Sequence, residues 1–169
     1  GGGVPSASLL SALAMHAGAH AIAALAVKAA GGQQLASTDF GETAGMEILS
    51  TLAAEFDSEA RYNLLNAMAN QLRYPNSHTH FFSCAILHIF STAKDEKVQE
   101  QITRVLVERL IVHRPHPWGL LVTFIELIKN QQYRFWDKPF TRCAPEIERL
   151  FESVARGALA PANAAAAPA

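Results

Sequence analysis

Apolar residues recur every three or four positions in one segment after another of this chain, and no stretch alternates apolar and polar residues as a strand does. The helical segments are expected at about residues 6–30, 43–55, 58–74, 77–92, 94–112, 118–129 and 145–156. An amphipathic helix is stable when a neighbour covers its apolar stripe. The pattern therefore predicts an all-α protein in which short turns join antiparallel helix pairs.

Such a series of helix pairs most resembles a HEAT-like stack, or α-solenoid, of about seven helices. Helix-breaking residues support the divisions, since Gly31-Gly32 ends the first helix and Pro75 ends the third near Tyr74. Asp57 or Ser58 caps the third helix, and Asn76 or Ser77 caps the fourth. Residues 31–42 are predicted to be a loop.

The helix at 118–129 carries apolar residues on nearly every side. Such a helix is normally buried between neighbours, so this one is expected at the centre of the stack. Glu126 is its only acidic residue. It is interpreted as facing solvent or a neighbouring arginine, and the alternative is a buried carboxylate of raised pKa.

Length and charge limit the classes of protein. The 169 residues fit a single helical domain at 6–156, between a disordered end at 1–5 and a disordered Ala/Pro tail at 157–169. The net charge is -1 and the 14 Lys and Arg residues are spread along the chain, which argues against direct nucleic-acid binding. The Ala-rich run 9–30 is interpreted as a helix of a soluble domain, with no membrane partner. The opening GGGVPSAS, without an initiator methionine, suggests a segment of a longer protein.

The stretch NSHTHFFSCAILHIF places three histidines and a cysteine close together, at His78, His80, Cys84 and His88. Ligands spaced four apart on a helix can bind zinc, and His80, Cys84 and His88 follow one stripe. The same stripe is also the polar edge of an ordinary amphipathic helix. The second interpretation is adopted, so that no metal and no cofactor are expected, and a zinc-binding helical domain is kept as an alternative.

His113 and His116 in HRPHPWG raise the possibility of acid–base chemistry. No serine, cysteine or carboxylate lies at a spacing that would pair with them, and no nucleophile elbow or phosphate-binding glycine loop occurs. The chain is therefore not expected to be an enzyme, and no catalytic residue is assigned. A histidine-dependent hydrolase is the alternative.

The irregular segment QQYRFWDKPF provides the candidate site. Interfaces use Trp, Tyr and Arg as anchors, so a protein-binding role is assigned to this group, although its aromatic rings could instead plug the end of the stack. The candidate residues are Tyr133, Arg134, Phe135, Trp136 and Phe140.

Long stretches of the chain resemble a known family. LLNAMANQLRYPNSHTHFFSC, QEQITRVLVERLIVHRPHPWGLLVTFIELIKN and CAPEIERLF are similar to the C-terminal Not-family homology region of the large scaffold subunit of the Ccr/Not mRNA deadenylase complex. The likeness is dense over 62–154 and looser over 6–56, and at His88 the family has an aromatic residue. The family's region is also longer on its N-terminal side.

The resemblance implies a HEAT-like domain without catalytic activity or metal. It implies docking of other Not subunits and of short peptide motifs from RNA-binding repressors. It also implies a role in mRNA decay, translational repression and RNA-mediated gene silencing, in the cytoplasm, with processing bodies, and in the nucleus.

Overall fold

The structure is a computed structural model that describes residues 5–142, 149, 151–153 and 156. No strand occurs among these residues, so the all-α prediction is confirmed. The helices are α1 (Ala7–Ala30), α2 (Ser37–Gly41), α3 (Ala44–Glu55), α4 (Ser58–Ala69), α5 (Ser77–Thr92), α6 (Glu96–Val112) and α7 (Trp118–Lys129). Three short 3-10 helices follow, η1 (Gln131–Tyr133), η2 (Phe135–Asp137) and η3 (Pro139–Arg142).

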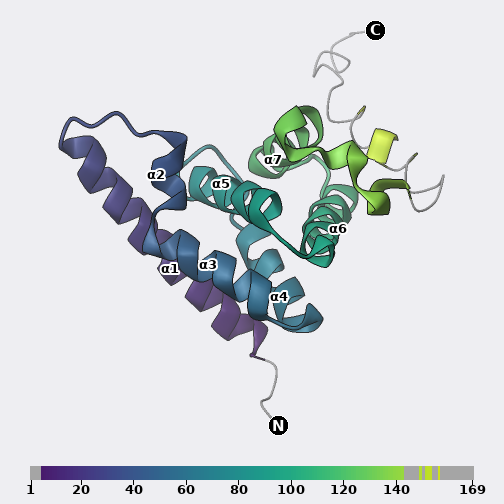
Figure 1. Cartoon of the computed structure of the whole chain (residues 1–169), viewed down its shortest axis with the longest axis horizontal. Helices are drawn as coiled ribbons and strands as arrows, with labels where there is room; N and C mark the ends of the chain where they lie inside the picture. Colours follow the sequence, from purple (N-terminus) through teal and green to yellow (C-terminus); the bar gives the residue numbers. More distant parts are fainter. Residues whose placement is uncertain (1–4, 143–148, 150, 154–155, 157–169) are drawn as a thin grey trace, which may run out of the picture.

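The helices form a layered stack (Figure 1). α1 runs along one edge with α3 and α4 packed against it, and α6 and α7 lie on the other side of the molecule. α5 lies between these groups and contacts each of the other α-helices. Its apolar side is buried as the sequence predicts, and the largest rings there, Phe81, Phe82 and Phe90, have no exposed surface.

Local capping explains where several helices begin and end. Asn76 Oδ1 accepts the Thr79 N–H at 2.9 Å at the start of α5, and Asp57 does the same for α4. α1 ends at Ala30, where Gly31 is the C-terminal cap and Gly32 has φ +78. A positive φ favours glycine, which explains the ending that the sequence predicts.

The predicted loop at 31–42 is wrong in its last part, because α2 forms there. Asp39 organises this short helix: its Oδ2 accepts the Ala36 N–H at 2.7 Å, and its Oδ1 accepts from Lys28 Nζ at 3.1 Å. Both contacts lower the pKa of the Asp39 carboxyl, the backbone hydrogen bond more than the lysine. Five residues show too little apolar periodicity for a helix to be recognised from sequence.

The third predicted helix is too long, since α4 ends at Ala69 rather than Tyr74. The backbone after this end makes contacts outside α4. The Thr79 hydroxyl donates to the Gln71 carbonyl at 2.9 Å, and the Gly119 N–H donates to the Arg73 carbonyl at 2.8 Å. Both carbonyls are used outside α4, and only the fold brings their donors close.

The prediction that the 118–129 helix is the centre of the stack is wrong. Within the described residues α7 packs on α5, α6 and the η segments, while Trp118 and Val122 are exposed. Glu126 is exposed and accepts a hydrogen bond from Asn130 Nδ2 at 2.7 Å, in agreement with the first of its two interpretations. The central helix is α5, because the other α-helices contact it from both sides.

α1 is the one helix in the described part of the chain whose length and composition would allow it to cross a membrane. In the structure its Leu10, Ala14 and Leu25 are buried against the stack. It approaches α3 very closely at Gly45, where an added Cβ would lie 2.2 Å from the Ala17 carbonyl oxygen. Small residues therefore allow the two backbones to touch.

The predicted helix at 145–156 and the two predicted disordered ends fall mostly outside the described residues. The described positions 149, 151–153 and 156 are helical. Among them, Phe151 is buried.

Candidate functional site

The aromatic segment after α7 folds into the three 3-10 helices and covers one end of the stack. Phe135 is 2% exposed. Its ring lies 6.3 Å from Phe90, 6.4 Å from Phe124 and 5.9 Å from Phe151, measured between ring centroids. Phe140 is also buried. These two candidate residues are therefore core residues that close the stack.

The other three candidates reach the surface. Arg134 is exposed, has the left-handed φ of 48, and pairs through Nε with Asp137 at 2.9 Å. Trp136 is 41% exposed, while its Nε1 donates to the Ile128 carbonyl at 3.0 Å. Tyr133 is half-buried, and burial raises the pKa of its hydroxyl. This segment thus holds an exposed Trp and Arg on a backbone anchored by buried rings.

The His and Cys edge of α5 faces α2. The Phe40 ring meets His80 edge to face with 5.1 Å between centroids, and Gly41 lies against the His88 imidazole. Cys84 Sγ lies 4.0 Å from His80 Nε2. A hollow of about 770 Å³ remains between the two helices, and it also reaches Tyr133.

This edge has no arrangement for a metal. Within the residues that the structure describes, no group of three or more His, Cys, Asp or Glu side chains is placed to hold an ion. Burial raises the pKa of the Cys84 thiol. The sequence alternative of a zinc-binding domain has no ligand set here.

His113 and His116 lie in the turn between α6 and α7. His116 Nδ1 is 2.9 Å from the His113 carbonyl oxygen, a contact that fixes the turn before α7. Both histidines line a pocket of about 500 Å³, which we call the turn pocket. Its lining contains no serine, cysteine or carboxylate among the described residues, so the hydrolase alternative has no partner group for either imidazole.

Sequence reasoning missed the turn pocket. It forms where the α4–α5 turn, with Arg73 and Tyr74, meets the α6–α7 turn, with His113 and Trp118. Both α5 and α6 lie between these two turns in the sequence. Tyr74 beside Pro75 and Trp118 after Pro117 were the available signals in the sequence.

The stacked helices define a helical domain of the HEAT-like type. The family model described as "CCR4-Not complex component, Not1" matches residues 4–155. The chain belongs to the Not1 family of CCR4-Not complex components.

Individual relatives agree with this assignment. The chain is 51% identical over 148 residues to the CCR4-NOT transcription complex subunit let-711 of Caenorhabditis elegans, covering 88% of this chain and 6% of that protein. It is 49% identical over 121 residues to the general negative regulator of transcription subunit 1 of Schizosaccharomyces pombe, covering 69% of this chain and 6% of that protein. The chain thus spans a small part of these relatives.

Two solved structures share the fold. The NOT1 superfamily homology domain from Chaetomium thermophilum has a TM-score of 0.77 and 36% identity, over 89% of this chain and 29% of that one. A Not1 C-terminal domain in complex with Not4 has a TM-score of 0.70 and 29% identity, over 87% of this chain and 29% of that one.

Proposed function

We propose that this chain is a non-catalytic protein-binding scaffold module of the mRNA deadenylase complex. It docks other Not subunits and short peptide motifs of RNA-binding repressors, and so acts in mRNA decay and translational repression. The observation that carries the proposal is the likeness to a Not1 C-terminal domain that was solved in complex with Not4. That likeness extends over 87% of this chain.

The three 3-10 helices, residues 131–142, are together called the η segment. Its exposed residues are proposed as one contact surface. Trp136 and Arg134 are residue types that interfaces favour, and both are held on a backbone that Phe135 and Phe140 anchor in the core. A pre-ordered backbone lowers the entropy that binding must remove. We include the half-buried Tyr133, which ends η1 in the same segment.

Partner binding rather than chemistry fits the surface best. The histidines lack a nucleophile or acid within the described residues that line their pocket, and the net charge of -1 opposes direct RNA binding. We propose that the module uses no cofactor or metal and does not attach to a membrane. We propose that the module acts in the cytoplasm, including processing bodies, and in the nucleus.

A pull-down with purified components tests the proposal. The chain is immobilised and incubated with the C-terminal regions of the partner Not subunits, Not4 among them. Circular dichroism first establishes that the chain is helical and unfolds cooperatively. Failure of every partner region to bind the folded chain refutes the proposed function.

Two variants test the η segment. Arg134→Asn removes the charge and keeps a residue type that tolerates the left-handed backbone. Lys28→Asn removes a charge at the end of α1 and breaks only an exposed ion pair. Weaker partner binding by the first variant and unchanged binding by the second supports the contact. Equal binding by both variants removes the η segment from the interface.

A further inference from the structure

The turn pocket is held open by a contact between two turns. The Gly119 N–H at the start of α7 donates to the Arg73 carbonyl at 2.8 Å. A Cβ on Gly119 would lie 2.4 Å from Thr79 Cγ2 and 2.9 Å from the Leu72 carbonyl carbon, so glycine permits this approach. Backbone therefore fixes the relative position of the two turns, and the pocket of about 500 Å³ is preformed.

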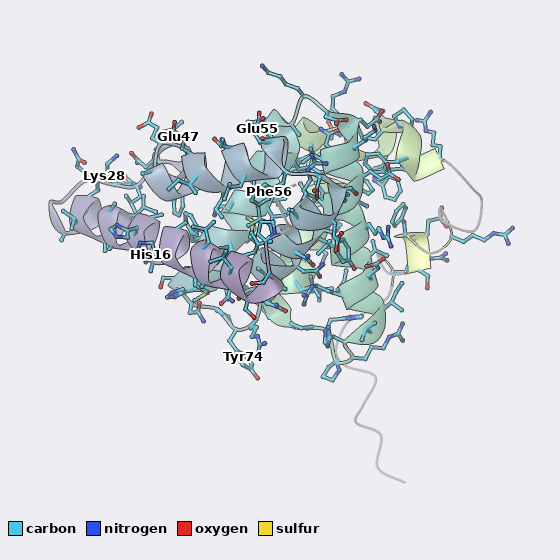
Figure 2. All side chains as sticks on the ribbon, turned by 90° about the horizontal axis from the view of Figure 1, so that it is seen from below. His16, Lys28, Glu47, Glu55, Phe56 and Tyr74 are labelled. Carbon is cyan, nitrogen blue, oxygen red and sulfur yellow. The ribbon has the colours of Figure 1, made fainter. Side chains whose placement is uncertain are left out.

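The floor of the pocket is apolar and its edge carries exposed aromatic rings. Leu72 and Leu120 are almost fully buried and form part of the lining. Tyr74 is 80% exposed and points away from the helices (Figure 2). Trp118 is 50% exposed. Exposed aromatic rings around an apolar depression are typical of sites that take up an apolar side chain.

Two arginines line the pocket, and no carboxylate among the described residues faces them. Arg73 and Arg109 are these residues, and none of the lining residues that the structure describes is an Asp or Glu. Arg109 Nε donates to Asn66 Oδ1 at 3.2 Å, and neither arginine forms an ion pair within the described part of the chain. The pKa of Arg109 is lowered, chiefly by burial, and the charge of Arg73 contributes to the lowering. A bound anion would offset the repulsion between the two arginines.

We propose that the turn pocket binds a short acidic segment of a partner protein, with an apolar side chain on Leu72 and Leu120 and a carboxylate facing Arg73 and Arg109. This proposal rests on the proposed function, since it assigns a site and a ligand chemistry to one docking event. The pocket matches both properties of such a segment: a charge that is complementary to carboxylates and a small apolar depression.

A protein segment fits the pocket better than nucleic acid. Nucleic-acid binding depends on neutralising several phosphates along a strand, whereas this surface offers two arginines around an apolar floor. Binding to RNA is therefore an outcome that contradicts the proposal.

Fluorescence anisotropy with synthetic probes tests the proposal. The first probe is a short fluorescein-labelled peptide of Asp and Glu residues around a central Leu. In the second probe Lys replaces the acidic residues, in the third Ser replaces the Leu, and the fourth is oligouridine of similar length. The wild-type chain is expected to bind the first probe most tightly, with an affinity that falls as salt is added.

Arg73→Glu reverses one charge at an exposed position and is expected to weaken binding of the acidic peptide by about tenfold. Lys97→Glu is the matched control, because it makes the same charge change about 18 Å away along α6 from Arg109. Equal loss in both variants indicates a general charge effect and contradicts the site.

The probe series remains informative even if a variant fails to fold, since the preference of the wild-type chain for acidic over basic peptide is measured separately. Equal binding of all peptides, or tighter binding of oligouridine, overturns the proposal. Successful pull-down of Not subunits together with no preference for the acidic peptide refutes the turn pocket while leaving the proposed function intact. If the pull-down fails while the chain still prefers the acidic peptide, the proposed function is refuted and the turn pocket remains a binding site for acidic segments.

Discussion

Gly45 in α3 allows α1 and α3 to approach so closely that replacing it with alanine should destabilise the protein. The added Cβ would lie 2.2 Å from the Ala17 carbonyl oxygen and 2.9 Å from Ala21 Cβ. An ordinary carbon–oxygen contact is about 3.3 Å, so the two helices have to move apart by roughly 1 Å. The nearest atom belongs to the backbone, so a change of rotamer cannot relieve the contact.

The expected magnitude follows from two opposing effects. Overpacking of this kind costs up to about 3 kcal/mol. Alanine gains at most about 1 kcal/mol over glycine in a helix. Gly45→Ala should therefore lower the free energy of unfolding by about 2 kcal/mol, which corresponds to a Tm decrease of roughly 4–8 °C for a chain of this size.

Urea unfolding followed by circular dichroism measures this change, and Gly31→Ala is the matched control. Gly31 has φ -75, and a Cβ there would lie 3.4 Å from the Lys28 carbonyl oxygen, an ordinary contact. The control should be unchanged or more stable by up to about 1 kcal/mol. If Gly45→Ala is as stable as Gly31→Ala, the close packing of α1 on α3 is refuted.

Three further changes test other contacts. Arg61→Met should lower the free energy of unfolding by about 3 kcal/mol in urea titrations, because the buried guanidinium donates to two carbonyls at the end of α3 at 2.6 Å each; no loss would contradict this role. Alkylation of Cys84 at pH 8, followed by peptide mass spectrometry, should be slower in the folded chain than in urea, because burial raises the pKa of its thiol; equal rates would oppose this. Hydrogen bonds from Arg104 and Tyr62 lower the pKa of Glu108, so that stability from this carboxylate is present above its unfolded pKa and lost as pH falls through the lowered value. Tyr62→Phe should raise that pKa in an NMR titration and reduce stability at neutral pH by about 0.5 kcal/mol; an unchanged pKa would exclude the contact.

Much of the fold could be predicted because helix periodicity and capping are local. The buried positions of α6, such as Val98, Ile102 and Leu110, follow directly from their spacing. The cap at Asn76 involves a residue only three positions away. Such features depend on neighbouring residues, so they are visible without knowledge of the tertiary structure.

The candidate site was predictable only in part. The sequence identified an aromatic segment outside the regular helices, but not which rings would be buried. Phe135 and Phe140 are buried because α5 and α7 converge there, while Trp136 points outward with its indole N–H bonded to the end of α7. The turn pocket left only Tyr74 beside Pro75 and Trp118 after Pro117 as signals in the sequence, since its walls come from two separate turns.

The sequence by itself therefore determined an all-helical domain, most helix boundaries, the buried stripes and, through long similar stretches, the Not1 family. Tertiary structure alone decided that α5 is the central helix, that two separate turns meet at the turn pocket and that the His and Cys edge of α5 faces α2. The physical reason is the separation along the chain of the residues that interact. Periodicity and capping act over a few residues, whereas these outcomes depend on contacts such as Gly119 to Arg73, which join residues far apart in the chain.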